Sequence, residues 1–164
     1  MAFVETDLAM EKIRLPILVE EVVPHKSPMS LLRHVITHDS ELTVCDVRIE
    51  QGTLFFKAGR VDSWVGLEYM AQAVAAHAGM ASRQRGKPPD IGFWLGTRRA
   101  DFFTDGYRLG QTLHVAVRRI WGEEELFSFD CSITDTADGH CLAKAQLNVF
   151  RPSNLKRIFK EVKT

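Results

Sequence analysis

One acidic residue stands alone in a long apolar stretch of the chain. Residues 63–82 carry a single formal charge, on Glu68, and Gln72 follows four residues later. In a helix this spacing places the two side chains one turn apart on the same face. Removing a carboxylate from water favours its protonated form, and a protonated carboxyl group near neutral pH is what a general acid requires.

We therefore expect Glu68 to act as a catalytic acid and Gln72 to orient its carboxyl group through a hydrogen bond. Two alternatives stay open. Glu68 could reach solvent or an arginine in a purely structural ion pair. Gln72 could bond only to nearby backbone, as most buried polar side chains do.

A histidine, His77, lies further along the same stretch. It follows Glu68 by nine residues, which is about 900° of rotation at about 3.6 residues per turn. The two side chains therefore point to opposite sides of a helix. We expect His77 to be a core histidine rather than a partner of Glu68 within one chain.

The stretch around Glu68 has the pattern of a buried helix. Asp62 and Ser63 are suitable N-cap residues, and Gly86 followed by two prolines supplies the end. Apolar side chains lie on all sides of this helix, so it must be buried all round. A helix of this kind in a water-soluble chain requires a sheet wrapped around it.

Strand patterns lie on both sides of the helix. After Gly86, apolar and polar residues alternate with a period of two in four segments, 91–103, 112–121, 125–135 and 140–150. The connections between them are short enough for hairpins, which predicts an antiparallel meander. Upstream, residues 29–37 and 42–49 indicate another strand pair, and 53–57 a short strand. Residues 153–164 are expected to form a basic surface helix.

Composition limits the class of protein. The 164 residues, 45% of them apolar, suit a single domain over 1–164, with a core at about 18–152 and an N-terminal extension. Lysine plus arginine equal aspartate plus glutamate at 21 each, which argues against nucleic acid as the main partner. No run of eighteen apolar residues and no secretory h-region occurs, so we expect a cytoplasmic protein without a membrane span.

Metal and nucleotide chemistry have no support in the sequence. The cysteines, Cys45, Cys131 and Cys141, are odd in number and lack zinc-type spacing, so we expect reduced, mostly buried thiols. No glycine-rich phosphate loop, dinucleotide fingerprint or HExxH motif is present. We expect neither a metal nor a bound cofactor.

Two segments carry a family resemblance. Residues 24–32, PHKSPMSLL, resemble the PHRxPxLL element of FabZ/FabA-type β-hydroxyacyl-ACP dehydratases, and residues 67–73, LEYMAQA, resemble their LEAMAQA helix. Residues 66–79 are more similar still to the pattern GIEYAAQAxAxHxG of the aryl-polyene-type, ApeP-like 3-hydroxyacyl-ACP dehydratases. The resemblance spans roughly residues 18–152. It implies an α+β hotdog fold, in which an antiparallel sheet wraps around one long central helix.

The same resemblance implies a reaction and partners. The expected activity is that of a hydro-lyase, which converts a 3-hydroxyacyl thioester to the trans-2-enoyl thioester in fatty-acid-like or aryl-polyene-like biosynthesis. The substrate would be carried on the phosphopantetheine of an acyl carrier protein. In the family a backbone amide five residues before the acid binds the thioester carbonyl, a position held here by Ser63 and followed by Trp64. Hotdog active sites lie between protomers, so we expect a homodimer or a heterodimer with a FabZ-like dehydratase.

Basic residues form clusters that could serve the carrier. They could meet the acidic surface of an acyl carrier protein or the phosphates of coenzyme A. These residues are Arg98, Arg99, Arg118 and Arg119, with Arg83, Arg85 and Lys87 after the helix. The same residues could equally serve solubility alone, as alternating charges on exposed strand faces do.

One departure from the FabZ pattern concerns the catalytic base. FabZ-type enzymes carry a histidine fourteen residues before the helix glutamate, and this chain has Leu54 there. His25 is our candidate for the base because it lies in the family-like element. The other four histidines are expected to be structural or solvated. His34 and His38 alternate in phase along one strand, which suits a surface or edge position, and His114 and His140 lie beside strand and turn residues with no acidic partner. Two further functions stay open, a hotdog acyl thioesterase and a non-catalytic subunit of a heterodimeric dehydratase.

Overall fold

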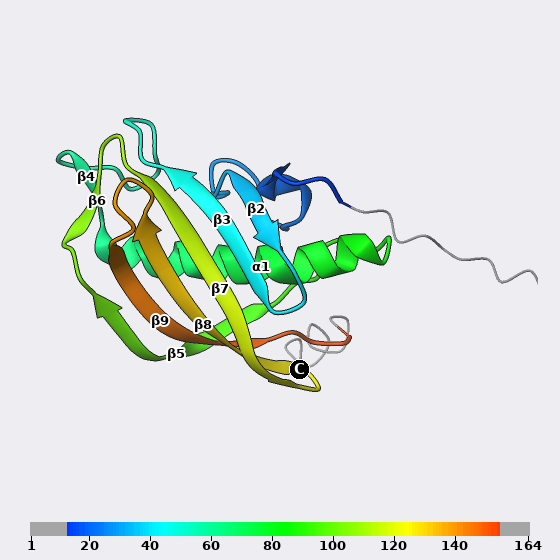
Figure 1. Ribbon diagram of the computed structural model, residues 1–164. Coiled ribbons are helices and arrows are strands. Elements are labelled where there is room, and N and C mark those ends of the chain that lie inside the picture. The colour runs from blue at the N-terminus through cyan, green and yellow to red at the C-terminus, as the bar shows by residue number, and fades with distance from the viewer. Residues whose placement is uncertain (1–12, 155–164) are drawn as a thin grey trace, which may run out of the picture.

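The computed structural model describes residues 13–154 (Figure 1). The start of the expected N-terminal extension, residues 1–12, and most of the expected C-terminal helix, residues 155–164, lie outside the described residues.

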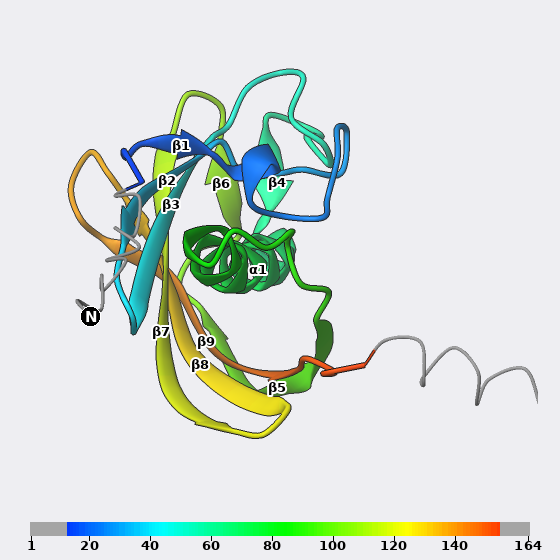
Figure 2. The ribbon, with the colours of Figure 1, turned by 90° about the vertical axis from the view of Figure 1, so that its right-hand side faces the viewer.

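A seven-stranded antiparallel sheet curves around one long helix, as the hotdog expectation requires. Figure 2 looks along the helix and shows the sheet passing beside and beneath it. The helix is α1 (Gly66–Gln84), and the strand order is β1-β2-β3-β7-β8-β9-β5. The strands are β1 (Ile17–Leu18), β2 (His34–His38), β3 (Leu42–Arg48), β5 (Phe93–Phe102), β7 (Thr112–Glu123), β8 (Leu126–Asp135) and β9 (Cys141–Phe150).

Alternation along the strands forms the inner wall of the core. In β7, Leu113, Val115 and Val117 are fully buried, and their neighbours in sequence face outward. Tyr69 and Met70 of α1 are likewise fully buried among the core residues. The expected period-two pattern is therefore confirmed for this strand.

The order of the strands differs from a simple meander. β7, β8 and β9 follow one another as expected, but β5 lies beyond β9 at the edge of the sheet, and β3 pairs with β7. The predicted short strand at 53–57 is wrong, because these residues form turns in which Phe55 has a positive φ of 67°. The strand at this point is β4 (Arg60–Asp62), which pairs with β6 (Gly106–Arg108).

The helix begins later than its cap residues suggested. Residues Ser63–Val65 form a short 3-10 helix, η2, and neither Asp62 nor Val65 makes a side-chain cap. The helix ends as expected, with Gly86 at a positive φ of 66° just after it.

Two glycines of α1 are required by close packing. A Cβ on Gly66 would collide with the Tyr107 hydroxyl, and one on Gly79 would collide with the backbone carbonyl of Val22. Val22 closes a second short 3-10 helix, η1 (Val19–Glu21), which lies against α1 at this point. Both ends of the GIEYAAQAxAxHxG-like segment thus have a steric reason for glycine.

Three cysteines are free, and two of them, Cys45 and Cys131, are buried, which agrees with the expectation of reduced thiols. No helix within residues 13–154 is long and apolar enough to cross a membrane.

Candidate active site

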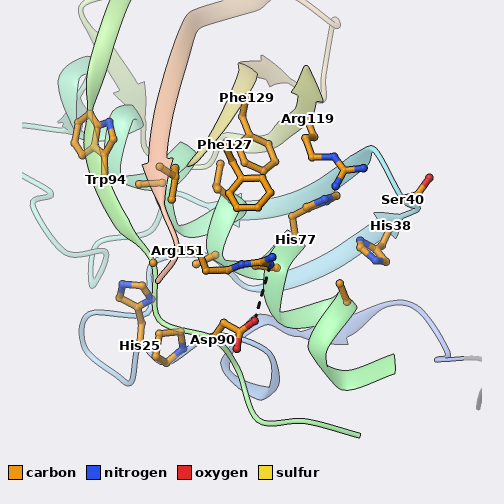
Figure 3. Close-up of a pocket in the computed structure, with 18 of the residues that line it drawn as sticks. His25, His38, Ser40, His77, Asp90, Trp94, Arg119, Phe127, Phe129 and Arg151 are labelled. Atoms are coloured by element: carbon orange, nitrogen blue, oxygen red, sulfur yellow. Dashed lines mark ion pairs between the residues drawn. The ribbon is translucent and has the colours of Figure 1, made fainter. Parts of the chain in front are cut away.

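A cavity of about 440 Å³ lies between α1 and the curved sheet. Small side chains of the helix, Ala71, Ala75 and Ala78, form one wall. Aromatic side chains of the sheet, Phe127 and Phe129, face it with Trp94 (Figure 3). The volume falls in the range of small-molecule sites, and the walls between the polar groups are apolar.

Glu68 lines this cavity, and its carboxylate accepts a hydrogen bond from Gln72. The Gln72 amide Nε2 donates a hydrogen bond to Glu68 Oε1 at 2.9 Å. Because this bond uses Oε1, the other carboxylate oxygen stays available to carry a proton. The hydrogen bond that the spacing predicted is present.

Gln72 also joins the helix to the loop before β2. It is fully buried, its Nε2 donates to the Met29 carbonyl at 2.8 Å, and its Oε1 accepts the Leu31 N–H at 2.9 Å. Both interpretations of Gln72 therefore hold at once, since one side chain orients Glu68 and satisfies backbone. The catalytic role of the pair stays a prediction.

His25 lines the same cavity as Glu68. It lies in the segment whose later residues, Met29 and Leu31, are bonded to Gln72. Its Nδ1 atom is buried and has no hydrogen-bond partner among residues 13–154. Figure 3 shows His25 at the end of the cavity where Asp90 and Arg151 form an ion pair at 3.9 Å. The structure thus brings His25 and Glu68 to one cavity, while the role of His25 as base stays a prediction.

Ser63 is not available for the predicted role. Its N–H donates to the Asp105 carbonyl at 3.1 Å, and its own carbonyl accepts the Tyr107 hydroxyl at 3.1 Å. The prediction that a free Ser63 amide binds the thioester carbonyl is therefore wrong for this conformation. Trp64 does not line the cavity either. Its side chain is 59% exposed, and its ring centroid lies 6.2 Å from that of Phe55.

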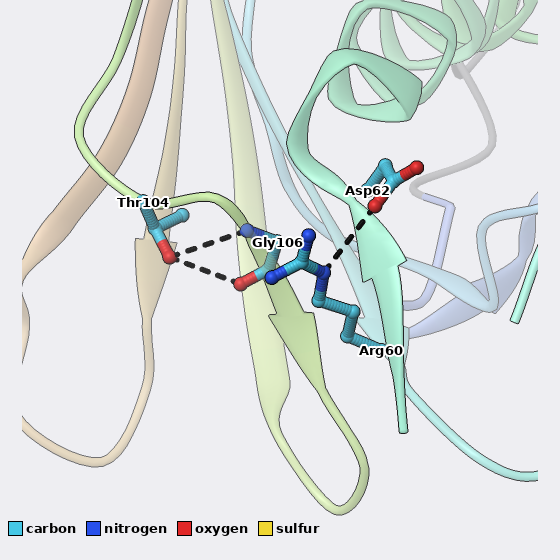
Figure 4. Close-up of polar contacts among 4 residues, drawn as sticks. All are labelled: Arg60, Asp62, Thr104 and Gly106. Carbon is cyan, nitrogen blue, oxygen red and sulfur yellow. Dashed lines mark hydrogen bonds and ion pairs between the residues drawn. The ribbon is translucent and has the colours of Figure 1, made fainter. Parts of the chain in front are cut away.

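The turn before β6 explains why Ser63 is occupied. The Thr104 hydroxyl donates to the Gly106 carbonyl at 3.0 Å and accepts the Gly106 N–H at 3.4 Å, so it closes the turn around Asp105 (Figure 4). On the adjacent strand, Arg60 Nε donates to the Asp62 carboxylate at 3.3 Å. The paired strands β4 and β6 hold the start of the helix against this turn.

His77 is buried, as expected, but it also lines the cavity. Its Nδ1 lies 2.8 Å from the Thr43 hydroxyl, and its ring meets the edge of Phe129 with centroids 5.5 Å apart. Burial lowers the pKa of His77 to about 4. His77 contacts Thr43 of β3. Glu68 is instead bonded to Gln72, which is bonded to the loop before β2. The expectation that His77 does not assist Glu68 directly agrees with these contacts.

The remaining histidines differ from expectation in their partners. His34 Nδ1 lies 3.1 Å from the Asp46 carboxylate, and His140 Nδ1 lies 2.8 Å from that of Asp138. The expectation that His140 has no acidic partner is wrong, because Asp138 lies in the same tight turn. His38 was expected at the surface, but it is half-buried and lines the cavity beside His77. Nothing in the sequence pattern indicated that His38 would lie beside His77.

Neither Leu54 nor its neighbours in that loop border the cavity. The loop therefore supplies no side chain in place of the FabZ-type histidine. Among residues 13–154, no three His, Cys, Asp or Glu side chains come together as a metal site.

Comparisons with known proteins agree with this architecture. One chain of the dehydratase heterocomplex ApeI:P from Xenorhabdus doucetiae superposes with a TM-score of 0.82 at 24% identity, covering 93% of this chain and 100% of that one. A hypothetical thioesterase with coenzyme A from Streptococcus pneumoniae gives 0.58 at 14% identity, covering 72% and 84%. The E. coli PaaI protein gives 0.55 at 15% identity, covering 71% and 81%. At these identities the likeness concerns the fold.

The sequence itself provides the family. No curated protein matches the chain. A family model described as ApeP dehydratase matches residues 17–160, which is most of the chain and includes Glu68, Gln72 and His25. The chain therefore belongs to the ApeP-like dehydratase family, and its role is acyl-thioester dehydration.

Proposed function

We propose that the protein dehydrates 3-hydroxyacyl thioesters carried by an acyl carrier protein and releases the trans-2-enoyl thioester. The observation that carries the proposal is the Glu68 carboxylate, which lines a cavity with apolar walls between its polar groups and accepts a hydrogen bond from the Gln72 amide at 2.9 Å. His25 borders the same cavity.

The reaction assigns one task to each group. A base removes the proton from C2 of the acyl chain, while Glu68 protonates the hydroxyl on C3, which leaves as water. The electron pair of the broken C2–H bond forms the C2=C3 double bond. Glu68 starts the cycle protonated and ends it as a carboxylate. The proton held by the base must then return to Glu68, directly or through water, before the next turnover.

His25 is the base that we propose within this chain. Imidazole is the side chain that most often serves as a general base, and the His25 ring borders the same cavity as Glu68. The thioester carbonyl needs hydrogen-bond donors other than the Ser63 amide, which is engaged. Trp64, the other candidate from the sequence, does not line the cavity, so we assign no donor of this chain to the carbonyl.

The assembly that we propose is a dimer, either with a second copy or with a FabZ-like dehydratase. β5 is an edge strand, and its residues Phe93, Trp94 and Leu95 are exposed. Trp94 also lines the cavity, so a chain paired at β5 would border the active site. The similarity to a chain of the ApeI:P heterocomplex supports the heterodimer, in which the partner could contribute the histidine that Leu54 replaces.

The carrier protein is expected to approach basic residues near the cavity. Arg99 pairs with Asp101 at 2.7 Å and Arg118 with Glu41 at 3.6 Å, so these two are engaged within the chain. Arg85 and Arg119 line the cavity instead, but they lie beside or beyond His77, away from Glu68, so neither is placed to meet the phosphate of a phosphopantetheine whose thioester lies at Glu68. No other cofactor is needed for this reaction.

The test uses a 3-hydroxyacyl-ACP substrate, with the protein alone and with a FabZ-like partner. Loss of water from the acyl chain is scored by mass spectrometry against release of free thiol. Glu68→Gln keeps the shape and the Gln72 contact but cannot donate the proton, so it should fold and give no enoyl product. Glu123→Gln, in the exposed end of β7, is the matched control. Dehydration by Glu68→Gln would remove Glu68 from the mechanism, and release of free thiol would favour the thioesterase.

A further inference from the structure

Two histidines at the cavity share one hydroxyl group. The Nδ1 atoms of His38 and His77 each lie 2.8 Å from Thr43 Oγ1, and their ring centroids are 5.3 Å apart. Thr43 is completely buried in β3. Both rings line the cavity, and Arg119 borders it beside them (Figure 3).

The shared hydroxyl determines the tautomers of the two rings. A threonine hydroxyl has one proton to donate and lone pairs to accept. If both rings donated to it, the buried O–H would have no acceptor, which is costly. If neither ring donated, one nitrogen lone pair would face the oxygen lone pairs. The arrangement that satisfies every group has one ring donating from Nδ1 and the other accepting at Nδ1.

Both rings are neutral at neutral pH, which this arrangement needs. Burial and, to a lesser extent, the neighbouring His38 lower the pKa of His77 to about 4. Burial also lowers the pKa of His38, although Asp39 opposes the shift. A neutral ring protonated at Nδ1 has a bare Nε2, and a ring that accepts at Nδ1 carries its proton on Nε2.

The two Nε2 atoms therefore differ, one as an acceptor and the other as a donor. Neither has a hydrogen-bond partner among residues 13–154, and neither is sealed from solvent, since the buried unpartnered atoms of that range do not include them. The side chains line the cavity with their Nδ1 sides engaged, so the Nε2 sides remain for a ligand.

We propose that His38 and His77 form a second polar subsite of the cavity, which binds a hydroxyl group at the far end of the acyl chain. A hydroxyl is the group that both donates and accepts, as this pair requires. The proposal rests on the proposed function for the orientation of the chain, with the thioester near Glu68. His77 follows Glu68 by nine residues, about 13.5 Å along the helix at about 1.5 Å per residue.

The walls between the two ends suit such a chain. Alanines of α1 and the rings of Phe127 and Phe129 lie along the cavity, with no charged side chain of the helix between Glu68 and His77. The hydroxyl could belong to an alkyl alcohol or to a phenol, and the aromatic walls accept both. Thr43 is a positioning residue, because it acts only through the two rings.

The first test needs no substrate. Nitrogen NMR of the histidine side chains at pH 7 should show one of the two rings protonated at Nδ1 and the other at Nε2. Thr43→Val, which removes the hydroxyl at nearly the same size, should abolish this difference. Two rings with the same tautomer in the wild-type protein would overturn the proposal.

The second test measures binding with non-hydrolysable acyl-pantetheine amides, followed by the fluorescence of Trp94, which lines the cavity. Matched medium-length chains end in methyl, hydroxyl, phenyl, hydroxyphenyl or carboxylate. Hydroxyl-ended chains should bind at least tenfold more tightly than their matched methyl or phenyl forms. The preferred pair, alkyl or aryl, identifies the source. Equal binding, or tighter binding of the carboxylate, which only accepts, would overturn the proposal.

A variant separates this subsite from the fold. His77→Asn places an amide where Nδ1 meets Thr43 but lacks the cavity-facing nitrogen, so it should fold and lose the tenfold preference. His77→Gln, which extends a polar atom toward the Nε2 position, should retain part of it. Neither readout needs turnover. If the wild-type protein dehydrates its substrate but binds hydroxyl-ended chains no better than the others, the subsite alone is refuted. If it prefers hydroxyl-ended chains but does not dehydrate, the proposed function alone is refuted.

Discussion

Replacing Gln72 with leucine tests the connection between the helix and the loop that carries His25. The side chain makes three hydrogen bonds, to Glu68 Oε1, to the Met29 carbonyl and from the Leu31 N–H, and all are between 2.8 and 2.9 Å. Leucine has a similar size, so Gln72→Leu removes these bonds without opening a large cavity. It leaves one part-buried backbone donor, of Leu31, and one part-buried backbone acceptor, of Met29, without this partner.

The expected loss of stability follows from those two groups. An unpaired buried backbone group costs about 1–3 kcal/mol, and the Glu68 carboxylate, which faces the cavity, adds little because water can replace its lost partner. Two such groups would cost about 2–6 kcal/mol if both were fully buried; because both bonds are only part-buried, we expect the free energy of unfolding to fall by about 2–4 kcal/mol. At roughly 2–4 °C per kcal/mol for a chain of this length, the melting temperature should fall by roughly 4–16 °C.

Turnover should fall as well, because the carboxyl group loses the donor that orients it. Urea unfolding and thermal melting measure the first effect, and enoyl formation from a 3-hydroxyacyl-ACP measures kcat and KM. We expect kcat to fall more than KM changes. Gln146→Leu in β9 is the matched control, since the side chain of Gln146 borders a groove on the sheet and forms no part of the cavity. Unchanged stability and unchanged kcat for Gln72→Leu would refute the account of this residue.

Three further outcomes are expected. His25→Ala should reduce turnover at least about 100-fold, as for a lost general base, with little change in melting temperature; turnover near wild type would exclude His25 and point to a base from the partner. The free energy of unfolding should fall by about 3 kcal/mol between pH 6.5 and pH 4, because the unfolded chain protonates His77 at its ordinary pKa while the folded chain resists until about 4. Urea titrations at both pH values check this, and His77→Asn should show a smaller loss. Gly79→Ala should lower the melting temperature, because its Cβ would collide with the Val22 carbonyl, whereas Gly52→Ala, where a Cβ meets nothing, should not.

The parts of this fold that depend on neighbours in sequence were predictable. The helix, the face shared by Glu68 and Gln72, and the alternation in β7 each follow from spacing along one element. The hydrogen bond between Glu68 and Gln72 is of this kind, because residues four apart on a helix are adjacent whatever surrounds them.

Features that depend on distant segments were not predictable. Alternation indicates which face of a strand is buried but not which strand lies beside it, so the place of β5 next to β9 was missed. β4 and β6 have three residues each, too few to show a period. The Ser63 amide donates to the carbonyl of Asp105, which lies 42 residues later. Thr43, which contacts His77 of α1, lies in strand β3.

The exposed edge of β5 has a consequence for the cell as well as for catalysis. Its first half presents Phe93, Trp94 and Leu95 on the open edge of the sheet, while its second half carries Arg98 and Arg99. Charges of this kind protect an edge from uncontrolled pairing, and the first half lacks them. A chain synthesised in excess of whatever covers this half would expose a sheet edge with which strands of other, incompletely folded proteins could pair. Synthesis in balance with whatever pairs at this edge therefore becomes a condition for keeping the protein out of aggregates and away from proteases.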